Sequence, residues 1–273
     1  MHIRPLTTID ECRQVAALER TVWGYADAED IMPPAVLIVS IRRGGILLGA
    51  FDERGAMKGF VYSLPAIKDG RPTQWSHMLG VTPDARGAGL GIRLKLAQRE
   101  AALAMNLDLI EWTFDPLQAV SAHLNFSRLG VVAEEYAENV YGASASALYG
   151  GAPTDRLIAA WKLRAPHVER RIAAAGPVMR DGSIATAPVV NPSPAGGTRL
   201  RPGEPDLTRH ERRVMIEVPM GYGEMVEHDP ALALEWRLTT RAAFAHYFAA
   251  GYRAVDFFLA PAAGKGQYLV VNS

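Results

Sequence analysis

The sequence predicts an α/β fold, with a smaller α+β unit toward its C-terminal end. Three observations predict it. Stretches with the alternation of β-strands follow one another over residues 46–81, separated by turns rich in glycine and charged residues. A helical pattern with leucines and alanines along one stripe comes directly afterwards, over residues 89–105. Beyond residue 165, proline and glycine become frequent before further helix and strand patterns appear.

The N-terminal residues predict one strand and two helices. Residues 2–7 form the first strand, and a helix follows to about Val22, with Gly24 at its end. A pair of prolines at 33–34 marks the start of the second helix, because proline is tolerated in a first helical turn. This helix ends before Gly44.

Six strands and two helices are expected in the middle of the chain. The glycine at 130 closes the second of these helices. The helices are expected over 89–105 and 117–129, and the strands over Ile46–Phe51, Met57–Pro65, Thr73–Val81, Leu107–Phe114, Val131–Tyr141 and Leu157–Leu163.

The pattern divides the chain into three parts: a domain over 1–165, a Pro/Gly-rich connector over 166–211 and an α+β unit over 212–273. The connector shows no regular period, which is typical of a loop or linker. In the last part we expect Arg213–Pro219, Val255–Leu259 and Tyr268–Val271 as strands and Asp229–Ala250 as a helix.

Composition argues against several classes of protein. Lys+Arg and Asp+Glu are both 29, so the basic excess of a nucleic-acid binder is absent. No apolar run reaches the roughly 20 residues of a membrane helix, and the first residues lack the apolar core of a signal peptide. We therefore expect a soluble, cytoplasmic protein without a membrane partner. Cys12 is the single cysteine, and the scattered histidines predict no metal site.

A glycine-rich turn joins the strand that ends at Val81 to the long helix. The N–H groups of a first helical turn have no internal partner, and the helix dipole adds positive charge, so this position suits an anion. Glycines let a phosphate approach the main chain closely. The alternative is a turn that merely packs the helix on the sheet. The predicted diphosphate cradle, in which the arginine adds a charge-assisted contact, is Arg86-Gly87-Ala88-Gly89-Leu90-Gly91.

Two other phosphate-binding motifs do not fit this turn. A P-loop requires Gly-Lys-Ser/Thr, which the sequence lacks. The dinucleotide pattern Gly-x-Gly-x-x-Gly fails in both frames, because Ile92 or Leu94 occupies the position of the third glycine.

With its flanking strand and helix, the stretch from Leu79 to Gly91 resembles the GNAT superfamily of acyl-CoA-dependent N-acyltransferases. The stretches at 76–81, 111–117 and 153–156 are similar to a less characterised branch of it. The core resemblance covers about residues 1–165. It implies a mixed, mostly antiparallel central sheet with helices on both faces, and acetyl-CoA or succinyl-CoA as the acyl donor.

The resemblance also implies roles for the strand before the cradle. Main-chain groups of Leu79, Gly80 and Val81 would pair with pantetheine, and one backbone N–H would polarise the thioester carbonyl. His77 stands where many members carry a glutamate general base, and simple alternation puts it on the face of Leu79 and Val81. A neutral imidazole suits proton transfer near pH 7. The alternative is a histidine that only hydrogen-bonds within the sheet.

One position departs from the family pattern. Phe126 occupies the place of a tyrosine that protonates the leaving thiolate, and the adjacent Asn125 can hydrogen-bond CoA but is no acid. Three explanations remain: the thiolate leaves without an acid, Tyr136 or Tyr141 supplies the proton, or the protein binds CoA without efficient catalysis.

For the acceptor site, the resemblance points to the loop between the first two helices and to the later strands. Trp23, Asp115 and Tyr141 are the candidate substrate residues, each with an alternative role in packing or in a turn. Arg237 and Arg241 lie one helical turn apart and either grip a carboxylate or form a solvated face.

The leading hypothesis is acyl transfer to the primary amine of a small molecule such as an amino acid. The second is a non-catalytic CoA-binding or regulatory module. A third gives the C-terminal unit a structural role, either completing the acceptor pocket or building a homodimer.

Overall fold

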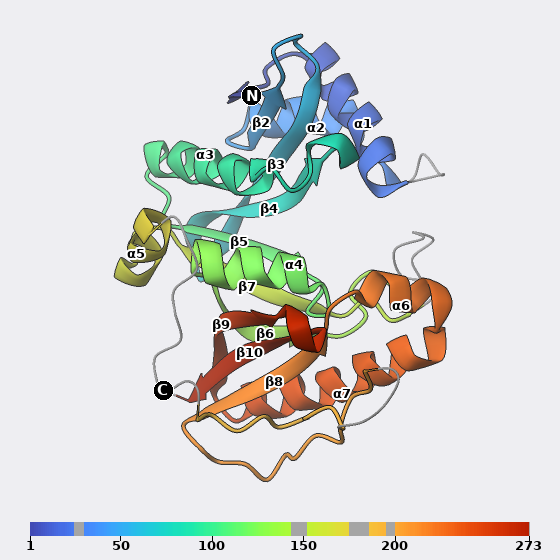
Figure 1. Ribbon diagram of the computed structural model, residues 1–273. Helices are drawn as coiled ribbons and strands as arrows, with labels where there is room; N and C mark the ends of the chain where they lie inside the picture. Colours follow the sequence, from blue (N-terminus) through green and yellow to red (C-terminus); the bar gives the residue numbers. More distant parts are fainter. Residues whose placement is uncertain (25–29, 143–151, 175–185, 195–199, 273) are drawn as a thin grey trace. The chain divides into compact units, whose positions relative to one another are not determined.

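The computed structural model describes residues 1–24, 30–142, 152–174, 186–194 and 200–272 (Figure 1). The chain forms two compact units. The first contains Met1–Trp112 and Lys162–Arg164, and the second contains Thr113–Trp161 and Ala165–Ser273. This division differs from the expected boundary at residue 165, because the segment after Trp112 belongs with the C-terminal strands.

The first unit is built on strands in the order β1-β2-β3-β4-β5. The pairs β1–β2, β2–β3 and β3–β4 are antiparallel, and β5 runs parallel to β4. The elements are β1 (His2–Pro5), α1 (Ile9–Trp23), α2 (Pro34–Ile41), β2 (Ile46–Phe51), β3 (Met57–Lys68), β4 (Arg71–Val81), a 3₁₀ turn (Pro83–Ala85), α3 (Leu90–Ala104) and β5 (Leu109–Phe114), whose last two residues fall in the second unit.

Helices cover both faces of these strands. Cys12 of α1 and Leu37 of α2 belong to one buried apolar cluster with Phe60 and Tyr62 of β3. On the other face, a Cβ on Gly59 of β3 would lie 3.2 Å from a methyl carbon of Leu94 in α3. Figure 1 shows α3 on the side of the strands opposite α1 and α2. The expected mixed, mostly antiparallel sheet with helices on both faces is therefore confirmed.

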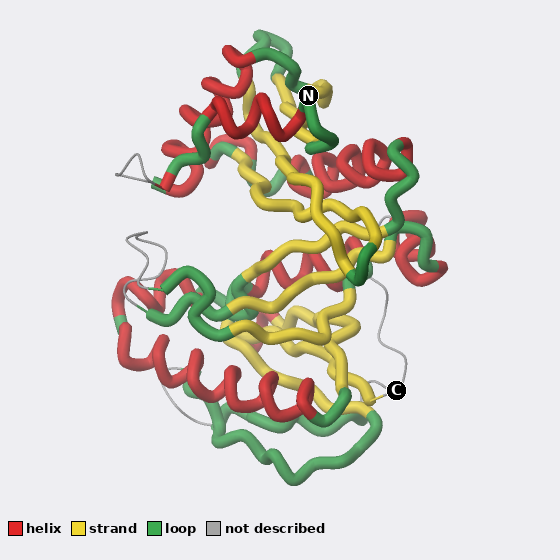
Figure 2. The backbone as a smooth tube through the Cα atoms, turned by 180° about the vertical axis from the view of Figure 1, so that it is seen from behind, coloured by secondary structure: helices red, strands yellow, loops and turns green. Residues whose placement is uncertain are grey.

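The second unit has strands in the order β7-β6-β9-β10-β8, each antiparallel to its neighbours. The long helix α7 packs along them (Figure 2). The elements are α4 (Ala119–Ala122), a π-helical continuation of it (His123–Leu129), β6 (Val132–Ala137), β7 (Arg156–Lys162), α5 (Pro166–Ala174), β8 (Arg213–Pro219), α6 (Tyr222–His228), α7 (Pro230–Ala249), β9 (Tyr252–Ala260) and β10 (Lys265–Asn272).

An aromatic core explains why the C-terminal strands do not form a unit of their own. Tyr268 of β10 has its ring 5.5 Å from Phe126 and 5.1 Å from Phe244 of α7, and Phe244 stacks on Tyr136 of β6. The backbone adds a pairing of β6 with β9 at Ala133. Segments from both sides of the connector thus share one core.

The connector is more ordered than a free linker where the structure describes it. The side chain of Asn191 exchanges two hydrogen bonds with the main chain of Glu217 in β8, and Val190 is fully buried. Residues 175–185 and 195–199 lie outside the described residues. The short helices α5 and α6 were not predicted from the sequence. No helix in the described ranges combines the length and apolar character needed to cross a bilayer.

Candidate functional site

The edge of β4 opens shortly before the glycine-rich turn. β4 pairs with β5 at Gln74–Ile110 and Trp75–Glu111, and among the described residues the ladder goes no further. The next residues on the two strands are Ser76 and Trp112. We call the opening that begins between these two residues the fork.

The main chain of β4 turns its polar groups toward the fork. Thr82 donates its N–H to the carbonyl of Lys58, at 2.9 Å. Hydrogen-bonded and non-hydrogen-bonded pairs alternate along an antiparallel ladder, so Gly80 also faces β3. The N–H and C=O groups of Leu79 and Val81 therefore point away from β3, toward the open edge. These are the groups expected to meet pantetheine.

A β-bulge breaks the regular alternation of β4. Tyr62 of β3 pairs with Met78, and the next residue, Ser63, pairs with Ser76, which leaves His77 as the extra residue. Bulges of this kind re-aim side chains. The sequence gives no signal for the bulge, because a period-2 pattern assumes an unbroken ladder.

Because of the bulge, the side chain of His77 lies on a different face of β4 from the one predicted. Ser76 bonds to side chains of α3, and Leu79 lies 3.9 Å from the position of a Cβ on Gly91 in α3. The ring of His77 instead lies edge-on to Tyr62, 6.3 Å between centroids, and Tyr62 belongs to the core under α1 and α2. The prediction that His77 shares the face of Leu79 and Val81 was wrong. It lies on the opposite face, beside the fork.

The surroundings of His77 favour its neutral form. The residue is exposed, yet neighbouring protein atoms desolvate the imidazole and lower the pKa of His77 below 6.5. Desolvation disfavours the cation. The imidazole is therefore mostly uncharged at pH 7 and able to accept a proton.

The glycine-rich turn has the geometry of an anion cradle. Gly87 and Gly89 have φ of +78° and +73°, which favour glycine. A Cβ on Gly87 would meet nothing within 4 Å, so the turn is open to solvent on that side. α3 has no side-chain cap, and its first i to i−4 bond runs from Arg93 to Gly89. The N–H groups that precede Arg93 in the first turn have no helical acceptor.

Arg86 is held by the main chain of its own unit. Its Nε donates to the carbonyl of Val81 and its Nη2 to the carbonyl of Val22 at the end of α1, both at 3.2 Å. These bonds tie the cradle to β4 and α1. The contact of Arg86 with a phosphate stays a prediction.

The candidate residues of the second unit lie in and around a buried polar network. Asp115 is 6% exposed, and its two carboxylate oxygens accept bonds of 2.8 and 2.7 Å from Arg237. Arg241 binds Asp155 in the same two-pronged way. Of the two roles considered for the arginine pair, a solvated face is wrong for Arg237, which is fully buried. The carboxylates that these arginines grip belong to the chain itself.

The other candidates of this unit differ in exposure. Tyr141 is 52% exposed, with its hydroxyl 3.0 Å from that of Thr113. Asn125 is buried, and its side-chain nitrogen has no hydrogen-bond partner among the described residues. Tyr136 donates to Asp155 at 2.6 Å, and burial raises the pKa of Tyr136. Phe126 is fully buried.

The candidates thus fall into two groups. Trp23, His77 and the cradle belong to the first unit, where the ring of Trp23 lies 5.9 Å from that of Phe60, edge to face. Asp115, Asn125 and Tyr141 belong to the second unit. Among the described residues no group of three or more His, Cys, Asp or Glu has the spacing of a metal site.

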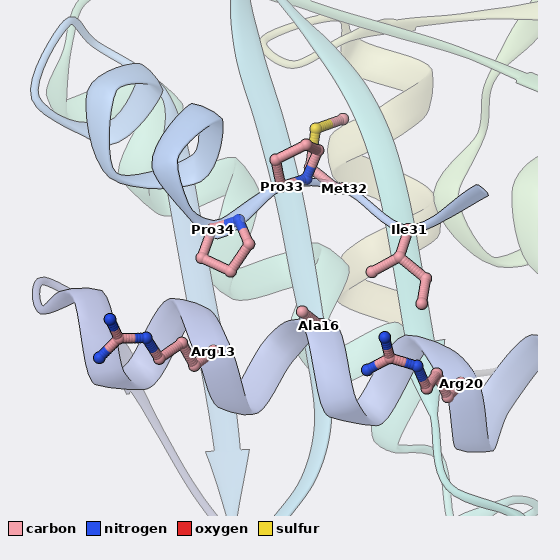
Figure 3. A pocket seen from close by; sticks show the side chains of 7 residues that line it. All are labelled: Arg13, Ala16, Arg20, Ile31, Met32, Pro33 and Pro34. Carbon is pink, nitrogen blue, oxygen red and sulfur yellow. The ribbon is translucent and has the colours of Figure 1, made fainter. Parts of the chain in front are cut away.

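A cavity of about 390 Å³ opens between α1 and the segment before α2 (Figure 3). Arg13 and Arg20 of α1 face residues 31–34 across it. Beside it, Glu19 is 1% exposed: its Oε2 accepts the N–H of Met32 at 3.0 Å, and its Oε1 has no partner among the described residues. Burial raises the pKa of Glu19 to about 7.

Sequence reasoning missed Glu19. The available signal was its position on the stripe of α1 that also carries Cys12 and Val15, since a carboxyl on an apolar stripe faces the core.

We expect Glu19→Gln to remove a pH-dependent loss of stability. Between about pH 4.5 and 7 the folded protein holds a proton on Glu19 that the unfolded chain has released, so stability falls as pH rises through this window. The amide keeps an acceptor for Met32 and carries no charge. The variant should gain about 1–3 kcal/mol relative to wild type between pH 5 and 8. Urea unfolding at both pH values measures it.

Glu100→Gln is the matched control, because the side chain of Glu100 is 69% exposed. The same pH dependence in wild type and Glu19→Gln would show that Glu19 ionises normally.

The comparisons with known proteins find similar solved structures but no match by sequence. No protein-family model matches the sequence, and no curated protein matches it. The similar solved structures include GNAT-family acetyltransferases. An acetyltransferase of the GNAT family from Streptococcus pneumoniae is 18% identical, with a TM-score of 0.48, over 58% of this chain and 97% of its own. A ribosomal-protein-alanine N-acetyltransferase from Brucella melitensis is 21% identical, with a TM-score of 0.47, over 59% of this chain and 98% of its own.

Proposed function

We propose that this chain is an acyl-CoA-dependent N-acyltransferase of the GNAT superfamily. It transfers a short acyl group, acetyl or succinyl, to the primary amine of a small molecule such as an amino acid. The observation that carries this proposal is that a strand with main-chain groups free for pantetheine runs directly into a helix start suited to a diphosphate. β4 directs main-chain groups of Leu79 and Val81 into the fork. The same strand leads into an uncapped helix start with glycines at positive φ at 87 and 89, and Gly87 has open space around it.

Each part of an acyl-CoA has a counterpart in the first unit. The diphosphate binds at the first turn of α3, where unpaired N–H groups and the helix dipole stabilise its charge. Pantetheine amides pair with the main chain of Leu79 and with the N–H of Val81, as an added strand would, since the carbonyl of Val81 already accepts from Arg86. The amine attacks the thioester carbon, a backbone N–H of β4 stabilises the oxyanion, and His77 takes the proton that the nitrogen loses.

The departure of the thiolate needs no dedicated acid in this proposal. Phe126 has no proton to give, and Tyr136 is committed to Asp155. A simple thiol has a pKa of about 8.5, so the thiolate is a tolerable leaving group near neutral pH. Tyr141, with its exposed side chain, is the alternative donor. The phenylalanine at 126 also favours the second candidate function, a CoA-binding module without efficient catalysis.

Thermal unfolding with acetyl-CoA and with succinyl-CoA tests the cradle, and we expect both ligands to stabilise the wild-type protein.

We expect Gly89→Ala to weaken CoA binding by about tenfold or more, because a side chain at positive φ distorts the helix start that binds the diphosphate. Gly55→Ala is the matched control: Gly55 has φ of +79°, open space around it, and a place in the β2–β3 turn. Both variants should lose similar stability.

Only the variant in the cradle should lose the CoA-induced shift. A wild-type protein that neither ligand stabilises would overturn the proposal. Binding without thiol release across a panel of amino acids would favour the non-catalytic module.

A further inference from the structure

A buried lysine bridges the fork from the α3 side. Lys95 of α3 is 2% exposed, and its Nζ donates to the hydroxyl of Ser76 at 2.8 Å. The same nitrogen lies 3.6 Å from the centroid of the Trp112 ring. Ser76 and Trp112 are the first residues beyond the last paired positions of β4 and β5. Lys95 therefore forms the floor of the fork at the point where the two strands separate.

The partners that this amine has in the described part of the chain are all neutral. Gln98, one turn along α3, accepts from Nζ at 3.2 Å and donates to the hydroxyl of Ser76 at 3.0 Å. Among the described residues, Lys95 thus contacts a hydroxyl, an amide and an aromatic face. A buried ammonium normally requires a carboxylate, because its desolvation costs several kcal/mol without one. Burial accordingly lowers the pKa of Lys95 well below its usual range.

The buried amine of Lys95 lies at the floor of the fork, where a core residue would ordinarily be apolar. An apolar side chain would close the floor of the fork without any desolvation cost. The chain instead holds a cationisable nitrogen there and orients it with two hydrogen bonds. A group of this kind binds an anion strongly once one is brought into the same dry site, because the attraction is weakly screened.

We propose that Lys95 binds the far end of the acyl group and thereby selects acyl-CoA donors whose acyl chain ends in a carboxylate. This inference rests on the proposed function, since it requires an acyl-CoA lying along β4. The carboxylate meets Nζ at the floor of the fork, favours the protonated form of the amine, and forms a buried ion pair with it. Ser76 and Gln98 hold the ammonium in place. An alkyl chain of equal length gains none of these contacts.

Binding measurements without any acceptor test this assignment. Succinyl-CoA and butyryl-CoA have acyl chains of the same length, so their dissociation constants isolate the terminal carboxylate. We expect the wild-type protein to bind succinyl-CoA at least tenfold more tightly. Lys95→Met keeps the length of the side chain without its amine, and it should bring the ratio close to one. The affinity of unacylated CoA should stay unchanged, which also reports that the variant is folded.

Calorimetry in buffers of different ionisation enthalpy supplies a readout that a structural role would not change. Succinyl-CoA should bind with proton uptake, because its carboxylate favours the charged amine that burial disfavours, and butyryl-CoA should bind without it. Equal affinity of wild type for both donors, or an equal loss for both in Lys95→Met, would overturn the assignment. Failure of wild type to bind unacylated CoA would instead sink the proposed function. If Lys95→Met does not fold, Ser76→Ala in the same assay should lower the ratio.

Discussion

His77→Ala is expected to lower kcat by about 10²–10⁴-fold, the usual contribution of a positioned general base. The amine must lose a proton as it attacks the thioester, and the imidazole of His77, beside the fork, is mostly uncharged near pH 7. CoA binding should be unchanged, because the cradle and the main-chain groups of Leu79 and Val81 do not depend on this side chain. Free-thiol release with a panel of amino acids measures the rate.

The pH profile separates a base from a residue that only supports the strand. Because the pKa of His77 is lowered, the wild-type rate should fall only below pH 6.5, as the imidazole becomes protonated. His77→Ala should lose this acid limb. His2→Ala is the control, since His2 is an exposed residue of β1. An unchanged rate in His77→Ala would assign the proton transfer to another group.

Arg237→Met is expected to lower the free energy of unfolding by about 3–5 kcal/mol. The substitution removes the two charge-assisted bonds of 2.8 and 2.7 Å from the buried carboxylate of Asp115, which keeps the N–H of Leu117 and Arg156 at 4.0 Å. A buried charge that loses its main partner is among the costliest defects in a core. Urea denaturation followed by circular dichroism measures the loss.

The exposed ion pair between Arg201 and Glu235 provides the matched control. Its side chains are 59% and 48% exposed, so Arg201→Met should cost less than about 1 kcal/mol. Adding Asp115→Leu to Arg237→Met should recover part of the stability, because it removes the buried carboxylate that has lost Arg237. If Arg237→Met were as mild as the control, the buried pair would contribute little to the second unit.

The sequence predicted the local structure well where a short segment carries its own signal. The strand Arg213–Pro219 lies as predicted, and the helix expected over Asp229–Ala250 differs from Pro230–Ala249 by one residue at each end. Gly24 ends α1 in the left-handed region, as expected of a glycine there. The short helices α5 and α6, of nine and seven residues, were not predicted because about two turns carry too little periodicity to distinguish a helix from a loop.

What the sequence by itself determined is the strand, the glycine turn and the helix that follow one another at the cradle. Their chemistry is local, since it depends on positive φ at two glycines and on unpaired N–H groups in one helical turn. The tertiary structure alone decided the rest. Asp115 meets Arg237 across 122 residues of sequence, a bulge against β3 re-aims His77, and Lys95 is buried beneath the fork among neutral partners. Such contacts form between distant segments, and no period or spacing along the chain specifies them.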